Sequence, residues 1–210
     1  MALDPQRERP RPGGPMSEEE YLTLNRNAPF VKYEYVNGVA RLMAGGSGEH
    51  DQISRNVAFA IETYLQSGPC FVRGSDMQVV IGAKADGSRH YVYPDVTVSC
   101  DVYDRRRGST QILSPRIVVE VLSPSTEPND RGPKLKAYKA CPDIQEILLI
   151  SQFAEHVEIH RRQGEDGTMW SYAQYDAGEA FMLESIDVPL TMNEVYRKIN
   201  FGEPLIGEED

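Results

Sequence analysis

The chain has 210 residues and a formal net charge of −10, with 40% hydrophobic and 26% charged residues. This composition is typical of one globular domain with tails, and no apolar run reaches the roughly 20 residues of a membrane helix. The acidic balance argues against binding of nucleic acid through overall charge, because phosphate affinity comes from clustered lysine and arginine. No apolar signal-peptide region is present at the N-terminus, so we expect a cytoplasmic location.

Three regions are expected along the chain. Residues 1–15 are rich in proline, glycine and arginine and predict a disordered tail. Residues 16–201 are expected to form the domain, and residues 202–210 an acidic tail. The sequence leaves open whether Met16 is the first residue of the protein.

Hydrophobic periodicity predicts a mixture of helices and strands. Ser17 and Glu20 form a capping box, and Asn37-Gly38 is a strong hairpin signal. The expected elements are, in chain order, a short helix from Ser17, a hairpin over 31–43, a helix over 49–66, strands over 70–81, 91–99 and 116–122, a helix over 130–141, strands over 145–151, 154–162 and 168–176, and a helix over 192–200.

The order of these elements predicts an α/β (α+β) fold. Strand, helix and strand over 116–151 imply a parallel crossover, while the hairpins imply antiparallel pairs. The expected architecture is therefore a mixed β-sheet with helices packed on it.

Two carboxylates interrupt apolar strands. Asp95 follows Pro94 at the start of one strand, and Glu120 lies among valines in the next. A charge is expensive to bury unless it is paired or binds a metal. If the strands pair, the two carboxylates converge and repel each other unless a cation holds them ionised. Mg²⁺ prefers such oxygens together with phosphate and water, which predicts a site for phosphodiester hydrolysis.

A structural interpretation of the same two acids stays open. Asp95 would then cap a turn, and Glu120 would pair with a lysine or arginine at the edge of the sheet.

A lysine near the carboxylates can orient the attacking water or stabilise developing charge. The helix expected over 130–141, with Asp130 as its N-cap, offers Lys134, Lys136 and Lys139. Because Tyr138 is expected to face the core, Lys134 borders the buried side better than Lys136 does. A solvated helix lysine is the simpler interpretation of either residue.

Glu34 and His50 are further candidates. Glu34 lies in the first hairpin, either as an exposed strand residue or as a third acid of the site. His50 begins the long helix, either as a structural histidine or as a ligand. His156 and His160 share a strand face with Glu158, and we expect this face to contact solvent.

The remaining motifs are interpreted as structural. Cys70, Cys100 and Cys141 are widely spaced and fit no metal pattern, so we expect buried free thiols in a reducing compartment. The glycine-rich run 45–48 lacks the residues of a nucleotide-binding loop and is interpreted as a flexible connection.

Three segments resemble a known family. PDVTV, RIVVEVLSPST and NDRGPKLKAYKACPDIQEILLIS are similar to the Uma-two family of restriction-endonuclease-like proteins, within the PD-(D/E)XK nuclease superfamily. The resemblance runs from about Ser17 to Phe201. It implies a restriction-endonuclease-like mixed β-sheet flanked by helices, with additional N- and C-terminal β-hairpins, and Mg²⁺-dependent cleavage of DNA.

The resemblance also implies roles for individual residues. Asp95 would be the acid of the PD half and Glu120 the acid of the (D/E)XK half, both holding the metal with help from the backbone carbonyl of Val121. Leu122 stands where the superfamily has lysine. In this family a lysine from the following helix is thought to replace it, and Lys134 is the matching position. Glu34 and His50 also match recurring positions, which implies accessory roles.

The sequence therefore predicts an endonuclease that hydrolyses DNA phosphodiester bonds with Mg²⁺, or with Mn²⁺ as a substitute. DNA is the expected partner, and a homodimer is left open. The alternative is a catalytically inactive nuclease-fold module that binds nucleic acid or protein, which the charge of −10 and Leu122 favour.

Overall fold

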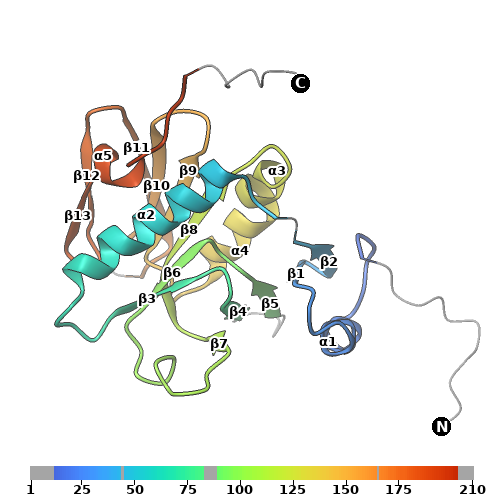
Figure 1. Ribbon diagram of the computed structural model, residues 1–210. Coiled ribbons are helices and arrows are strands. Elements are labelled where there is room, and N and C mark those ends of the chain that lie inside the picture. Colours follow the sequence, from blue (N-terminus) through green and yellow to red (C-terminus); the bar gives the residue numbers. More distant parts are fainter. Residues whose placement is uncertain (1–11, 44, 83–88, 165, 203–210) are drawn as a thin grey trace, which may run out of the picture.

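The computed structural model describes residues 12–43, 45–82, 89–164 and 166–202, which form two mixed β-sheets, a small hairpin and helices (Figure 1). The strands are β1 Tyr33–Val36, β2 Val39–Leu42, β3 Phe71–Gly74, β4 Gln78–Gly82, β5 Arg89–Val92, β6 Val96–Ser99, β7 Gln111–Ile112, β8 Pro115–Leu122, β9 Glu146–Ser151, β10 His156–Gln163, β11 Met169–Asp176, β12 Ala180–Leu183 and β13 Val188–Thr191. The helices are α1 Glu18–Asn27, α2 Gly48–Tyr64, α3 Glu127–Asn129, the π-helical turn η1 Asp130–Lys134, α4 Leu135–Ala140 and α5 Met192–Val195.

The two sheets contain five and six strands. The first has the order β2-β1-β5-β4-β7, and the second has the order β11-β10-β9-β8-β6-β3. Each contains one parallel pair, β4 with β7 and β8 with β9, among antiparallel neighbours. The predicted mixed α/β architecture is confirmed.

The N-terminal elements form as their local signals predict. Ser17 caps α1 through the expected capping box with Glu20. Asn37 and Gly38 connect β1 to β2 with φ of 51° and 77°, the left-handed backbone that this residue pair favours. Part of the expected tail is ordered: the Gly13 N–H donates to the Ala40 carbonyl (2.7 Å), so the chain already contacts β2 there. Residues 1–11 and 203–210 of the expected tails lie outside the described residues.

Two expected strands are each split. Residues 70–81 form β3 and β4, separated by a turn in which the Met77 N–H donates to the Gly74 carbonyl (3.1 Å). Residues 91–99 form the end of β5 and all of β6, because a proline has no N–H for the ladder between them. Since β5 and β6 belong to different sheets, the segment Tyr93-Pro94-Asp95 joins the two sheets.

The predicted parallel crossover joins β8 to β9 through one helical segment, 127–140. This segment begins before the predicted start. Asp130 is therefore not an N-cap but lies inside the helical segment, where the π-helical turn runs to Lys134.

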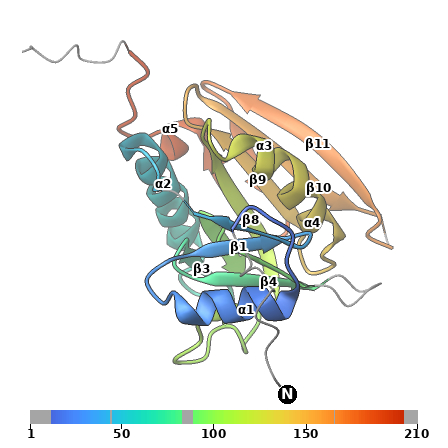
Figure 2. The same cartoon turned by 90° about the vertical axis from the view of Figure 1, so that its right-hand side faces the viewer.

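Alternate side chains of β8 enter two different cores. Val119 and Val121 pack with residues of α2, the β12–β13 hairpin and α5. Val118 and Leu122 pack with residues of α4 on the other face. Figure 2 shows α2 on one side of this sheet and α3 and α4 on the other. Because strand side chains alternate, Glu120 points to the face that α4 covers.

Two further expectations are corrected. Cys70 and Cys100 form a disulfide, because the antiparallel pairing of β3 with β6 places them opposite each other just beyond the Phe71–Ser99 pair. Cys141 is a free, buried cysteine as expected. The helix expected over 192–200 is only the short α5. None of the helices in the described parts of the chain combines the length and the apolar character needed to cross a membrane.

His160 predicts a loss of stability in mild acid. Burial, followed by the nearby Lys139, lowers the pKa of its imidazole to about 4. The unfolded chain therefore binds more protons than the folded protein between about pH 6.5 and pH 4, and stability falls as pH falls through this range. The full shift corresponds to about 3 kcal/mol. Urea denaturation at a series of pH values measures this dependence.

His160→Phe is the matching variant. Phenylalanine keeps a ring opposite Tyr172, whose centroid lies 5.1 Å from the imidazole, but it carries no titrating group. We expect a flatter pH profile between pH 6.5 and 4 for this variant. An unchanged slope would contradict the assignment.

Candidate active site

Asp95, the residue before β6, lies opposite Glu120 of the neighbouring strand β8. Val96 pairs with Val119 in the antiparallel β6–β8 ladder, so the next opposed pair is Asp95 and Glu120. Directly opposed residues point to the same face of a sheet. The Val121 N–H donates to Asp95 Oδ2 (2.7 Å) and fixes this carboxylate just before the start of β6. The structure therefore brings the two acids together, as the strand pattern predicts.

The ammonium group of Lys134 lies among three carboxylates. Its Nζ is 2.8 Å from Glu120 Oε1, 2.9 Å from Glu34 Oε1 and 3.1 Å from Asp130 Oδ1. Only 4% of the Lys134 side chain is exposed. Lys136 is exposed, so Lys134 is the lysine that the helix directs into the site.

Glu34 and Asp130 enter the site from different elements. Glu34 comes from β1 and also accepts the Tyr93 N–H (3.0 Å), so it is a buried member of the cluster and not an exposed strand residue. From the sequence, Asp130 is expected only to cap the helix. Asp130 and Lys134 are four residues apart, however, and this spacing places two side chains on one helix face. π-helical turns such as η1 are frequent at functional sites.

Carboxylates outnumber cations in this cluster. Burial raises the pKa of Glu120 well above its ordinary value, although Lys134 acts in the opposite direction, and the neighbouring acids raise it further. Burial raises the pKa of Asp130 as well. Burial alone would lower the pKa of Lys134, but the facing carboxylates raise it well above its usual value, so the amine stays protonated. The cluster therefore has more acidic groups than cations, and a bound cation would hold these acids in their ionised form.

Tyr138 completes the hydrogen bonding of Glu120. Its hydroxyl donates to Glu120 Oε1, the same oxygen that contacts Lys134. Burial, followed by the charge of Glu120, raises the pKa of this phenol well above its ordinary value. The helical pattern predicts that Tyr138 faces the core, but it does not predict this polar contact.

His50 borders the site from the first turn of α2. Its Nε2 lies 3.3 Å from Asp95 Oδ2, and the hydrogen bond to Asp95 raises the pKa of the imidazole despite partial burial. Gly46 packs closely on this ring, because a Cβ atom there would lie 2.7 Å from His50 Nδ1. Ser47 caps α2 by accepting the His50 N–H (3.2 Å). The glycine-rich run 45–48 therefore has a defined packing role and is not only a connection.

A cavity of about 210 Å³ opens onto these residues. Glu34, His50, Asp95, Glu120, Asp130 and Lys134 all line it. It adjoins a second cavity of about 620 Å³, and His50 and Asp95 line both cavities. All the site residues expected from the sequence, except the backbone of Val121, line one cavity.

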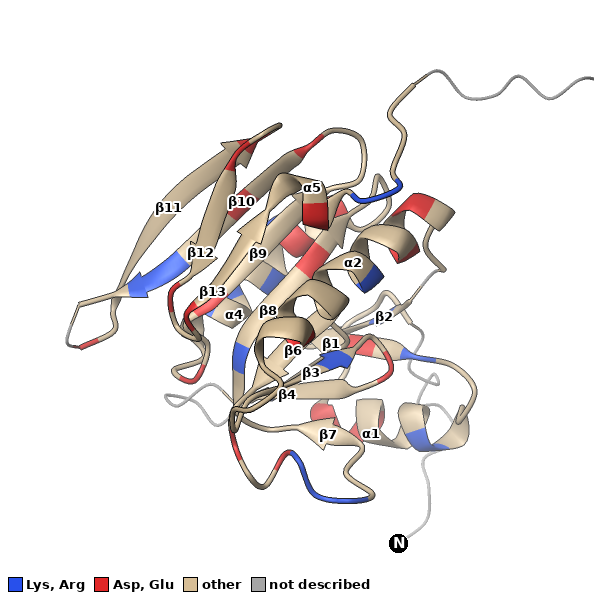
Figure 3. Ribbon diagram, turned by 60° about the vertical axis from the view of Figure 1, so that its left-hand side comes forward, with Lys and Arg blue, Asp and Glu red and all other residues tan. Residues whose placement is uncertain are grey.

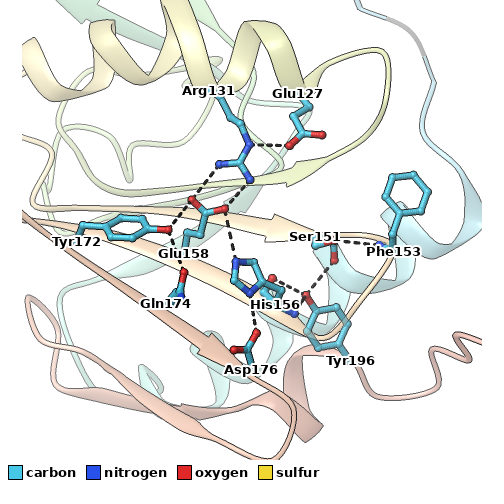
Figure 4. Close-up of polar contacts among 10 residues, drawn as sticks. All are labelled: Glu127, Arg131, Ser151, Phe153, His156, Glu158, Tyr172, Gln174, Asp176 and Tyr196. Atoms are coloured by element: carbon cyan, nitrogen blue, oxygen red, sulfur yellow. Dashed lines mark hydrogen bonds and ion pairs between the residues drawn. The ribbon is translucent and has the colours of Figure 1, made fainter.

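A polar network outside the cavity braces the helical segment that carries Asp130 and Lys134. Arg131 Nη1 donates to Glu158 Oε2 (2.9 Å) and its Nη2 contacts the other carboxylate oxygen, so the pair is bidentate (Figure 4). Glu127 Oε1 accepts from Arg131 Nε (2.6 Å). The hydrogen bond from Arg131 lowers the pKa of Glu158, which keeps this strand carboxylate ionised.

The strand face beneath this network is covered, contrary to the sequence expectation. Glu158 is 7% exposed and His160 is 8% exposed. The Tyr172 hydroxyl donates to Glu158 Oε2 (3.2 Å), and His156 Nδ1 lies 2.7 Å from Asp176 Oδ1 (Figure 4). Alternation predicted that these side chains share a face, but the helix that covers it comes from a distant part of the chain.

The comparisons with known proteins agree with this architecture. A family model described as "Uma2: Putative restriction endonuclease" matches residues 18–193. The chain belongs to the Uma2 family. This confirms the resemblance noted in the sequence.

Two relatives come from Synechocystis sp. (strain ATCC 27184 / PCC 6803 / Kazusa). This Uma2 protein is 35% identical over 187 residues to "Uncharacterized protein slr1290", covering 89% of this chain and 94% of the relative. It is 29% identical over 151 residues to "Uncharacterized protein sll1609", covering 71% of this chain and 82% of the relative.

A crystal structure shares the fold. The "putative nuclease belonging to DUF820" from Anabaena variabilis ATCC 29413 superposes with a TM-score of 0.68. The match covers 87% of this Uma2 chain and 98% of the other, at 18% sequence identity.

The donor chemistry of the Uma2 site fits a divalent cation. Within the described residues, no three His, Cys, Asp or Glu side chains form a ready metal-binding group. Mg²⁺, however, commonly takes one or two carboxylates and completes its shell with water and phosphate. The opposed pair Asp95 and Glu120 supplies two oxygen donors, and the excess negative charge favours a cation.

Lys134→Met is expected to destabilise the protein by about 3–5 kcal/mol near pH 7, because it leaves buried carboxylates without their cation. Lys136→Met, on the same helical segment but exposed, is the control and should change stability by less than about 0.5 kcal/mol. Urea denaturation measures both. Equal losses in the two variants would show that the ion pairs of Lys134 do not hold the cluster together.

Glu158→Gln is expected to lower stability by about 1–2 kcal/mol, because it breaks a partly buried bidentate pair and leaves Arg131 with a neutral partner. Glu127→Gln removes the more exposed contact of the same guanidinium and should cost less than about 1 kcal/mol. Thermal denaturation of both variants decides the order. A larger loss of stability in Glu127→Gln than in Glu158→Gln would contradict the conclusion that the Arg131–Glu158 pair holds the helical segment in place.

Proposed function

We propose that the chain is a Mg²⁺-dependent endonuclease that hydrolyses DNA phosphodiester bonds. The observation that carries the proposal is the placement of Asp95, just before β6, opposite Glu120 of β8, with the buried ammonium of Lys134 beside Glu120. Membership of a family whose description reads "Putative restriction endonuclease" supports the same reaction.

Asp95, Glu120 and the carbonyl of Val121 would hold the cation. Bound there, a divalent cation would activate the attacking water and neutralise charge on the phosphate. Since a raised pKa keeps Lys134 protonated, its part is to stabilise negative charge and not to remove a proton. His50, hydrogen-bonded to Asp95, orients that carboxylate.

DNA is the proposed partner despite the acidic chain. The basic stretch 105–107 lies between β6 and β7, and Figure 3 shows a basic segment beside β7. This stretch follows the C-terminal end of β6, whereas Asp95 precedes the N-terminal end of the same strand. The homodimer that the sequence leaves open would present one site to each strand of a duplex.

A nuclease fold that binds without cutting is the second candidate. Lys134 is already paired with three carboxylates, and Leu122 occupies the usual lysine position. Both observations favour a structural role for Lys134 and not a catalytic one.

The deciding experiment is a cleavage assay with supercoiled, linear and single-stranded DNA in Mg²⁺ or Mn²⁺. We expect nicking by the wild type and a loss of roughly 10²-fold or more in Asp95→Asn and Glu120→Gln. Glu62→Gln, an exposed acid on α2, is the matched control and should keep full activity. Chelation with EDTA should abolish cleavage.

Calorimetric titration with Mn²⁺ separates the two candidates. Metal binding that Glu120→Gln weakens, without any cleavage by the wild type, would favour the non-cutting module. Cleavage that survives in Asp95→Asn would place the reaction elsewhere.

A further inference from the structure

An apolar lip borders the candidate active site. It consists of Phe30 and Val31, which precede β1, and of Leu42 and Met43 at the end of β2. Phe30 is 99% exposed and Leu42 is 59% exposed. Single exposed apolar residues are common, but three of them beside one acidic site, together with the half-buried Met43, form an apolar surface suited to contact with a partner.

The lip is held in a defined position. The Met43 N–H donates to the Lys32 carbonyl (3.0 Å), which extends the β1–β2 pairing to the lip itself. The Val31 N–H donates to the Ala28 carbonyl (3.0 Å), which closes the turn that presents Phe30. Lys32 Nζ contacts the Ser75 carbonyl (3.1 Å) and so ties this segment to the β3–β4 turn.

The lip forms a wall of the cavity of about 620 Å³ that adjoins the catalytic acids. Phe30, Val31 and Met43 line this cavity, and His50 and Asp95 line it from the side of the site. Its volume lies within the roughly 300–1,000 Å³ typical of small-ligand pockets. A group of the size of a nucleoside can therefore lie beside Asp95 and against the lip.

The charge of this cavity selects what can occupy it. Among the described residues that line it, Lys32 and His50 are the basic side chains, and both are already paired, Lys32 with Asp76 and His50 with Asp95. Asp51 and Asp95 line the same cavity and would repel a phosphate that lies along it without a cation. An uncharged, flat, apolar-faced group fits this wall, and the two nucleosides that a phosphodiester joins carry such a group, the base.

We propose that the apolar lip is a stacking platform for an unpaired nucleobase next to the cleaved phosphodiester, with Phe30 as the positioning residue. This inference rests on the proposed nuclease function. A base inside a duplex is stacked on both faces, so the preferred substrate is DNA with an unpaired base at the cleavage point, either in a single strand or flipped out of a helix.

The test compares Phe30→Ala, Phe30→Trp and Phe153→Ala. Phe153 is also exposed, at 61%, but lies in the turn between β9 and β10, so its alanine variant is the matched control. Binding is measured by fluorescence anisotropy with a labelled single strand, its fully paired duplex and the same duplex with one bulged base, in Ca²⁺. Cleavage of the three DNAs is measured in parallel with Mn²⁺.

We expect Phe30→Ala to bind the single strand and the bulged duplex about 5- to 150-fold more weakly than the wild type, which is the effect of losing one stacked base. Phe30→Trp should restore binding, and Phe153→Ala should bind like the wild type. The fully paired duplex should be affected less. The same order should appear in the cleavage rates.

The outcomes separate this inference from the proposed function. Cleavage by the wild type, with Phe30→Ala binding and cutting all three DNAs equally well, would overturn the stacking platform and leave the nuclease standing. A Phe30-dependent preference for unpaired DNA without any cleavage would support the platform and overturn the nuclease. No binding of any DNA by the wild type would overturn the platform.

Discussion

The buried ammonium of Lys134 and the carboxylates around it are the interaction on which this region of the protein depends. Each buried charge loses several kcal/mol of hydration, and only mutual pairing offsets that loss. The three carboxylate partners come from β1, β8 and η1, which belong to both sheets and to the crossover helix. The ammonium group of Lys134 therefore fixes the relative positions of β1, β8 and η1. Because the cluster has more carboxyl groups than cations, a second cation would also be attracted to it.

The two sheets meet where the charges meet. Tyr93-Pro94-Asp95 passes from one sheet to the other, and its first and last residues both contact the site. The Tyr93 N–H binds Glu34, and the Asp95 carboxylate accepts the N–H of Val121. Because a proline here cannot donate to either ladder, the chain leaves one sheet and enters the other at this point. This change from one sheet to the other also places Asp95 next to Glu120.

The charged cluster is braced by other residues on one side and borders an open cavity on the other. On the inner side, the Arg131–Glu158 pair holds the helical segment on β10, and Tyr138 hydrogen-bonds Glu120. On the outer side, Gly46 packs on His50, and the apolar lip around Phe30 borders the open cavity. Rigid support and an open approach on opposite sides are what a site needs in order to hold charged groups in place while a large substrate reaches them.

The local elements and the acidic character of the strand residues Asp95 and Glu120 can be predicted from the amino-acid sequence alone. The capping box at Ser17, the Asn37-Gly38 turn and the apolar runs of β8 and β9 each depend on neighbouring residues, so periodicity predicts them. The contacts between distant parts of the chain appear only in the folded molecule: Glu34 at the ammonium, the Cys70–Cys100 disulfide, and the covered face of β10. These contacts depend on strand register and on how a helix lies on a sheet. A single sequence carries no local signal for either.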